Sequence, residues 1–263
     1  MMNLTNIEYI ILRFIRKFFF TTNLLNYVGK YICYYQTNAN QQYPNGVAQS
    51  YLKHMNQSLE DKMVVEIGVG ATNSIGYELV ALTNCKYTGI EPFVNFNRKL
   101  DRAVLDKVTQ DYPHIKTSSI SRINDIKSIA DNSVDVLLSN SVLEHVTDME
   151  SLCKEMRRVL KHDGIMLHVV DYRDHFFKYP FHFLQFSKTT WNRWLNPGDL
   201  PRWRLSNHLE IFENNGFRPH VVEMKRDTDN FTKIRAYLHY DFKNNDPLID
   251  VTTAVLIVNA RQN

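Results

Sequence analysis

Two glycines and two acids lie where apolar runs of this chain end. Glu66, Gly68 and Gly70 close the run MVVEIGVG that begins at Met63, and Glu91 follows the next strand-like run. Glycine lets a backbone approach a ligand without a Cβ clash, and a carboxylate can accept both hydroxyls of a ribose through its two oxygens. Ligands of parallel α/β sheets bind beyond the carboxyl ends of the strands. This order of residues predicts a pocket for an adenosine-bearing ligand at that edge of a sheet.

The spacing of the glycines excludes two common nucleotide sites. A dinucleotide fingerprint, G-x-G-x-x-G, needs a third glycine for close helix–strand packing, and Asn73 occupies that position. A phosphate-binding Walker loop needs Gly-Lys-Ser/Thr, which does not occur in the chain. What remains is Glu-x-Gly-x-Gly.

Over roughly residues 60–171 the sequence resembles the class I S-adenosylmethionine-dependent methyltransferases. Three further motifs are in register with the glycines: GIEP at 89–92, DNSVDVLLSNSVLEHV at 131–146 and RVLKHDG at 158–164. Thr72 stands where a third glycine is common in the family, which narrows the loop. The resemblance implies S-adenosyl-L-methionine as the cofactor, and its expected contacts are Glu66, Gly68, Gly70, Glu91, Ser121 and Asn140. Of these, Glu66 is expected to orient the loop or meet the ammonium group, Ser121 to approach the adenine, and Asn140 to lie near the sulfonium.

Strand and helix patterns alternate from about residue 60. Alternation of this kind produces a parallel sheet with helices on both faces. The expected fold is α/β, with a Rossmann-like, seven-stranded, mostly parallel sheet and an antiparallel last strand. A capping-box spacing between Thr147 and Glu150 marks the start of one helix. The apolar patterns predict strands at 63–67, 86–90, 115–119, 134–139, 165–170, 219–224 and 251–259, and helices at 74–82, 95–110, 209–214 and 233–242.

Candidate catalytic residues gather at the ends of the fourth and fifth predicted strands. Methyl transfer from a sulfonium is an in-line displacement, and a base helps when the acceptor is a hydroxyl. The candidates for that base are His145, Asp171 and His175, while Glu144 lies in the same cluster. His168, inside a strand, is read as a core residue. A metal set of Asp171, His175 and His182 is an alternative whose spacing fixes no geometry, and no metal is predicted.

Residues 172–206 are aromatic and basic, and they are too long for an ordinary connection. Aromatic faces stack on sugar rings, and cations hold phosphate or carboxylate groups. The segment is therefore expected to bind the acceptor, although its phenylalanines can equally well cover a sheet edge. Residues 168–186 resemble methyltransferases found among bacterial cell-surface polysaccharide genes, which favours a saccharide hydroxyl.

The N-terminal region has two interpretations. On a helix over residues 7–20, Ile7 and Phe14 share an apolar face, and Arg13 and Lys17 lie on a basic one. The helix either packs on the domain, as a lid for example, or lies on an anionic membrane surface. Its uninterrupted apolar run is too short to span a bilayer. The expected organisation is a helix and linker over 1–45, and a methyltransferase domain over 46–263 that contains the insert at 172–206.

Composition narrows the function. A net charge of +3 over 263 residues does not indicate an extended nucleic-acid surface, so no nucleic-acid partner is expected. Three widely spaced cysteines indicate a reduced, cytoplasmic chain, with peripheral contact at the inner membrane face if the helix binds lipid. The expected activity is O-methylation of a small-molecule or cell-surface glycan acceptor. The alternatives are methylation of a quinone or lipid at the membrane, and a non-catalytic cofactor-binding scaffold. The sequence leaves the oligomeric state open.

Overall fold

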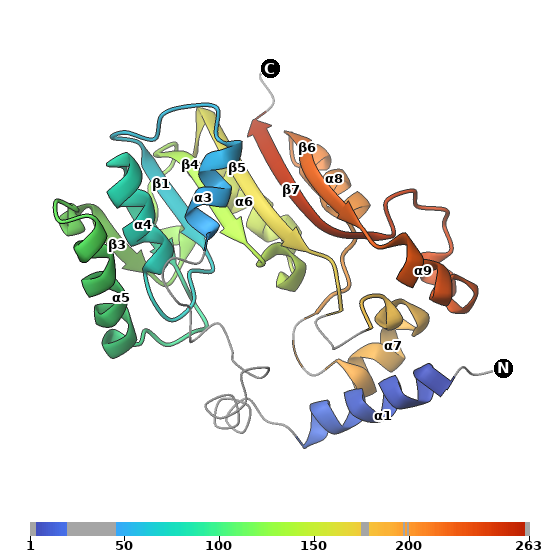
Figure 1. The fold of residues 1–263 in the computed structure, drawn as a ribbon. Coiled ribbons are helices and arrows are strands. Elements are labelled where there is room, and N and C mark those ends of the chain that lie inside the picture. The colour runs from blue at the N-terminus through green and yellow to red at the C-terminus, as the bar shows by residue number, and fades with distance from the viewer. Residues whose placement is uncertain (1–3, 20–45, 175–178, 197, 199, 261–263) are drawn as a thin grey trace.

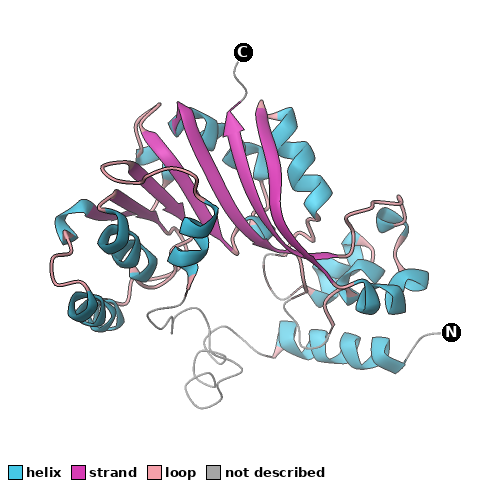
Figure 2. Ribbon diagram, turned by 45° about the horizontal axis from the view of Figure 1, so that its top comes forward, coloured by secondary structure: helices cyan, strands magenta, loops and turns pink. Residues whose placement is uncertain are grey.

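The computed structural model describes residues 4–19, 46–174, 179–196, 198 and 200–260. A seven-stranded sheet of order β3-β2-β1-β4-β5-β7-β6 forms its centre (Figures 1 and 2). The first five strands pair in parallel, and β7 is antiparallel to both β5 and β6. The strands are β1 Met63–Ile67, β2 Lys86–Ile90, β3 Ile120–Ile123, β4 Val134–Asn140, β5 Leu160–Asp171, β6 Phe217–Arg226 and β7 Val251–Ala260.

Helices cover both faces of this sheet, as the alternation along each strand dictates. Val64 on β1 packs with α3 (Val47–His54) and α4 (Ser74–Thr83), while its neighbour Val65 packs on the opposite side with α6 (Met149–Val159) and α8 (Leu205–Asn214). α5 (Arg98–Asp111) lies outside α4 through Val104 and Val108. The predicted Rossmann-like fold is confirmed, including its antiparallel last strand.

A separate apolar cluster lies beyond the end of β5. It joins α1 (Leu4–Phe18), part of the predicted insert, and α9 (Thr228–Ile234). The insert contributes a short 3-10 helix at His182–Gln185, α7 at Lys188–Thr190 and a π-helical turn at Trp191–Leu195. Figure 1 shows α1 and α7 side by side at this end of the molecule. Of the predicted N-terminal helix and linker over 1–45, residues 20–45 lie outside the described residues.

Several predicted elements differ from the structure. The prediction of a third strand at 115–119 was wrong: residues 117–119 form a 3-10 turn, and β3 begins at Ile120. β3 is the edge of the sheet, where an exposed serine and a half-buried arginine replace the alternating apolar pattern. The helix predicted at 95–110 begins only at Arg98, because the Asn97 side chain accepts from Leu100 N at 3.1 Å and caps it there.

The C-terminal half also differs in detail. Asp148, rather than Thr147, caps α6, since its carboxylate accepts from Ser151 N at 3.0 Å. The helix predicted at 233–242 is instead α9, followed by 3-10 turns at Arg235–Tyr237 and Tyr240–Phe242. α8 and β6 each extend beyond their predicted limits.

Candidate functional site

The glycine bend after β1 takes a backbone conformation that favours glycine. Gly68 has φ of 78° and Gly70 of 67°. A Cβ on Gly68 would lie 2.4 Å from Val142 Cγ2, so that position has no room for a side chain. A Cβ on Gly70 would meet nothing within 4 Å. The bend therefore leaves open space at Gly70, as a cradle for a ligand requires.

Glu91 lies against this bend and is held there by the backbone. Its Oε2 accepts from Gly70 N at 2.9 Å, and its Oε1 accepts from Phe93 N at 2.9 Å and Val94 N at 3.0 Å. The residue is only 6% exposed. A carboxylate offers about four acceptor sites, so about one remains for a hydroxyl donor. Glu91 is a pre-oriented acceptor at this edge, and its role toward the ribose stays a prediction.

Glu66, on β1 two residues before Gly68, is buried and hydrogen-bonded to other protein groups. Tyr51 Oη on α3 donates to its carboxylate at 2.9 Å, and Tyr87 Oη on β2 donates to the other oxygen. Burial raises the pKa of Glu66 to about 7, against the opposing effect of the two hydroxyl donors. Both donors lie outside the glycine bend, so the two expected roles of Glu66 stay predictions.

Arg122 on β3 is a site residue that the sequence analysis did not identify. Its guanidinium donates to the carbonyl oxygen of Gly70 and to that of Thr72 at 3.4 Å. It also lies over the ring of Phe96, 5.1 Å from the centroid. The sequence analysis missed Arg122 because it predicted the third strand too early in the chain. In the observed register, Arg122 lies opposite Gly89, near the carboxyl ends of the strands.

Two of the expected cofactor contacts occupy different depths in the sheet. Ser121 Oγ lies 2.7 Å from Thr88 Oγ1, two residues before β3 ends at Ile123. Asn140 is the last residue of β4, and the next residue, Ser141, has φ of 54°. Asn140 thus lies at the edge that carries the glycine bend, whereas the hydroxyl of Ser121 is engaged within the sheet. Their roles toward the cofactor stay predictions.

Two carboxyl groups come together at the ends of β4 and β5. Glu144, in the 3-10 turn Leu143–His145, is 2% exposed. Burial raises its pKa to about 8, and the charge of Asp171 adds to that rise. Asp171 forms an ion pair with Arg173, whose Nη2 lies 2.6 Å from Oδ2. His145 lies on the same turn with an exposed side chain, and His175 is outside the described residues.

The buried histidines near this edge are neutral core residues. His168 Nδ1 lies 2.8 Å from Ser139 Oγ, and His208 Nδ1 lies 2.9 Å from the Tyr172 hydroxyl. Burial lowers the pKa of each histidine to about 3. The reading of His168 as a core residue agrees with these contacts.

Several aromatic side chains of the described part of the insert are buried. Phe181, Phe183 and Trp191 are each at most 1% exposed. His182 contacts the rings of Tyr9 and Tyr179, at centroid distances of 5.3 and 4.4 Å, and burial lowers its pKa to about 4. Among the described residues, no group of three or more His, Cys, Asp or Glu side chains could hold a metal ion.

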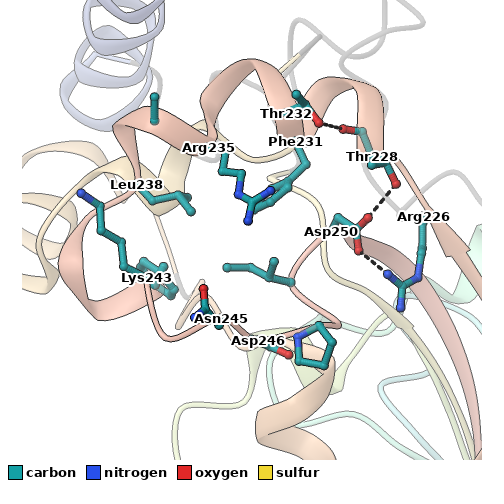
Figure 3. Close-up of a pocket in the computed structure, with 14 residues that line it drawn as sticks. Arg226, Thr228, Phe231, Thr232, Arg235, Leu238, Lys243, Asn245, Asp246 and Asp250 are labelled. Carbon is teal, nitrogen blue, oxygen red and sulfur yellow. Dashed lines mark hydrogen bonds and ion pairs between the residues drawn. The ribbon is translucent and has the colours of Figure 1, made fainter.

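A cavity of about 660 Å³ lies beyond the ends of β6 and β7 (Figure 3). Its acidic side chains are engaged: Asp250 pairs with Arg226 at 3.0 Å, and Asp246 accepts from Ser206 at 2.6 Å. Among the described residues, no acidic side chain forms an ion pair with Arg235 or Lys243, which also line it. The floor is apolar and consists of Phe231, Leu238, Phe242 and Ile249.

Arg204 connects the wall of the cavity to Tyr172, the residue that follows β5. Its guanidinium donates to Tyr172 O at 2.5 Å and to Ile249 O and Val251 O at 2.7 Å. β5 and β6 both flank β7, and neighbouring strands lie ~4.8 Å apart. The cavity is therefore roughly 10 Å along the sheet from the end of β5.

Comparison with known proteins agrees with this geometry. The family described as "Methyltransferase domain" matches residues 65–168, from β1 to β5. None of the curated proteins matches the sequence.

Solved structures share the fold at low identity. Phosphoethanolamine N-methyltransferase 2 of Haemonchus contortus, with phosphomonomethylethanolamine and S-adenosylhomocysteine, has a TM-score of 0.57 at 15% identity, over 95% of this chain and 60% of that one. YcgJ of Bacillus subtilis has a TM-score of 0.52 at 16% identity, over 82% and 98%. A Haloferax volcanii protein, solved as a complex with the Trm112 methyltransferase activator, has a TM-score of 0.50 at 18% identity, over 82% and 89%.

These structures support the architecture, and the matched domain contains the glycine bend and Glu91. The open cradle at Gly70 and the oriented carboxylate fit the cofactor of that domain. Residues 65–168 match a methyltransferase domain, and this match together with the open cradle indicates an S-adenosylmethionine-dependent enzyme of class I.

Proposed function

We propose that this enzyme methylates a hydroxyl group of a small-molecule or cell-surface glycan acceptor, bound beside the ends of β4 and β5. The observation that carries the proposal is the pairing of Glu144 with Asp171 at that edge. A carboxyl group with a pKa of about 8 is a far stronger base than an ordinary one, and removal of a hydroxyl proton requires such a group. The three candidates of the sequence analysis, His145, Asp171 and His175, stay candidates for direct contact with the acceptor.

Each part of the site has a distinct task in this proposal. S-adenosylmethionine, when bound, supplies a methyl group on a sulfonium. Gly68 and Gly70 admit its methionine portion, and Glu91 fixes its ribose. In its ionised form Glu144 accepts the proton of the acceptor hydroxyl, and the charge of the neighbouring Asp171 helps to keep the pKa of Glu144 high.

The cavity next to β7 supports an acceptor that carries an acidic group. Arg235 and Lys243 are cations suited to carboxylate or phosphate, and the apolar floor suits the body of a sugar ring or lipid. One sugar unit spans part of the roughly 10 Å between the cavity and the end of β5. An anionic glycan can therefore be held at two points.

The test is incubation of the enzyme with isotopically labelled cofactor and extracts of the glycans and lipids of its host. We expect label in a glycan or small polar fraction, as a methyl ether by mass spectrometry. Asp171→Asn, His175→Ala and Glu144→Gln are then compared across pH, with the exposed Asp163→Asn as a control. Label on nitrogen, or full activity of all three variants at every pH, contradicts the proposal.

A second candidate is methyl transfer to an isoprenoid quinone or other lipid at a membrane. One observation favours it: a row of large apolar side chains on α1, among them Ile11 and Phe14, is exposed on the outer side of the helix. Label recovered in the lipid fraction of the same extract experiment distinguishes this candidate from the first. In either case we place the reaction in the cytoplasm, in keeping with the buried free thiols of Cys85 and Cys153.

A further inference from the structure

The N-terminal helix packs on the enzyme with three polar side chains turned inward, beside the half-buried Ile10 and Leu12. Tyr9 and Arg13 are 0% and 4% exposed, and both contact the carboxylate of Asp174. Asn6, also buried, donates to Gln185 Oε1 at 2.8 Å. These buried polar contacts fix which side of α1 faces the protein. An amphipathic helix of a soluble domain ordinarily buries its apolar stripe instead.

The outward face of α1 is consequently apolar. Its side chains are between 36% and 66% exposed, and Trp194, at 42%, extends the surface onto the neighbouring turn. The rings of Phe14 and Phe18 each lie 6.3 Å from that of Trp194, so the surface is continuous. We call this set the α1 surface, and it consists of Ile7, Ile11, Phe14, Ile15, Phe18, Phe19 and Trp194.

Cations border this surface. Lys17 Nζ lies 5.8 Å from the ring centroid of Phe18, and the Arg193 guanidinium lies 5.0 Å from that of Trp194. The one acid of the helix, Glu8, accepts from the Tyr179 hydroxyl instead of facing a partner. Bulky apolar residues, a tryptophan at the margin and flanking Lys and Arg are the composition of helices that lie in a membrane interface.

The fold also orients the α1 surface. α1 lies beyond the edge of the sheet where β5 ends, which is the edge of the acceptor site (Figure 1). No helix among the described residues is long and apolar enough to cross a membrane. A helix of 15 residues is about 22 Å long and can lie flat on a bilayer.

We propose that the α1 surface docks the enzyme on an anionic phospholipid bilayer, with the helix parallel to the membrane plane. The charge of its border favours anionic lipid over a neutral bilayer, and over a second copy of this surface with the same cations. The inference does not depend on which acceptor is methylated.

The test is sedimentation of the full chain with vesicles of phosphatidylcholine, with and without phosphatidylglycerol. We expect binding to the anionic vesicles and at least about tenfold weaker binding for Ile11→Ser combined with Phe14→Ser, because insertion of two large apolar side chains contributes well over one order of magnitude. The matched control combines Leu82→Ser and Val222→Ser, which are similarly exposed at 38% and 44% on other faces. We expect the control to bind as the wild type does.

Two further measurements separate the explanations. Lys17→Gln with Arg193→Gln should reduce the preference for phosphatidylglycerol. Titration with S-adenosylhomocysteine should give unchanged affinity for every variant, which shows that each is folded and that the cofactor site is independent. Wild-type protein that stays in the supernatant, or equal sedimentation of the α1-surface variant, overturns the proposal. So does an ultracentrifugation result in which the same substitutions only convert a dimer to a monomer.

Discussion

We expect cofactor affinity to depend most directly on Glu91. Its carboxylate is oriented by three backbone N–H groups and lies against the glycine bend. Hydrogen bonds to charged groups contribute ~1.5–3 kcal/mol each, so Glu91→Ala should weaken S-adenosylhomocysteine binding by at least about tenfold. Isothermal titration calorimetry measures this, with the exposed Glu60→Ala as the control. Unchanged affinity would remove Glu91 from the ribose role.

The two glycines of the bend should respond differently to alanine. Gly68→Ala places a Cβ 2.4 Å from Val142 Cγ2 at φ of 78°, so we expect a loss of stability of roughly 1–3 kcal/mol in urea unfolding. Gly70→Ala has space for its Cβ in the protein but fills the cradle, so we expect a small stability loss and markedly weaker cofactor binding. If both variants lost stability equally and bound the cofactor equally, the assignment of open space at Gly70 to the ligand would be wrong.

At the scale of single residues, the sequence predicted those positions that belong to a recognisable motif. Residue type and spacing predicted Glu91 and the two glycines as cofactor contacts, and the structure brings them together at one bend. Arg122 was missed because its importance comes from the register of an edge strand. The burial of Glu144, which raises its pKa, depends on packing that no local pattern encodes.

Among the elements, α3 is joined to the sheet through Glu66. The pKa of this carboxyl is about 7 in the folded protein and near its ordinary value of 4.5 when unfolded, so the folded state binds more protons between these values. The free energy of unfolding should therefore fall as pH rises from about 4.5 to about 7, by about 3 kcal/mol if no other group compensates. Glu66→Gln should flatten this dependence, because the amide stays neutral and can still bond both tyrosines. Urea unfolding at several pH values tests this, and an equal slope in both proteins would contradict it.

Strong periodicity predicted the central elements well. β1 and β2 were predicted within their observed bounds, because central parallel strands are buried on both faces and read as apolar runs. β3 was displaced because an edge strand needs little apolar surface. The caps of α5 and α6 shifted by one or more residues, since several neighbouring polar residues compete for the role and the backbone geometry selects one.

At the scale of the whole molecule, cofactor binding should raise the free energy of unfolding. S-adenosylhomocysteine at about 100 times its Kd should add ~2.7 kcal/mol to the free energy of unfolding. That corresponds to a rise of roughly 5–10 °C in Tm for a chain of this size. NAD should give no rise, because Asn73, in place of a fingerprint glycine, donates its N–H to Asp101 at 2.7 Å and closes that end of the loop. Differential scanning calorimetry with both ligands measures the contrast, and a shift with NAD alone would overturn the cofactor assignment.

The orientation of α1 could not be predicted from its helical pattern. The pattern located an apolar and a basic side, and ordinary packing would have buried the former. Asp174, which is far from α1 in the sequence, determines the orientation of the helix. Its buried carboxylate is paired with Arg13 and hydrogen-bonded to Tyr9, so these residues face the protein.

The same carboxylate lies three residues after Asp171. Movement of the first helix would therefore act on Asp171 through the contacts of Asp174 and three residues of chain. If α1 docks on a bilayer as proposed, we expect the bound and the free enzyme to differ in rate.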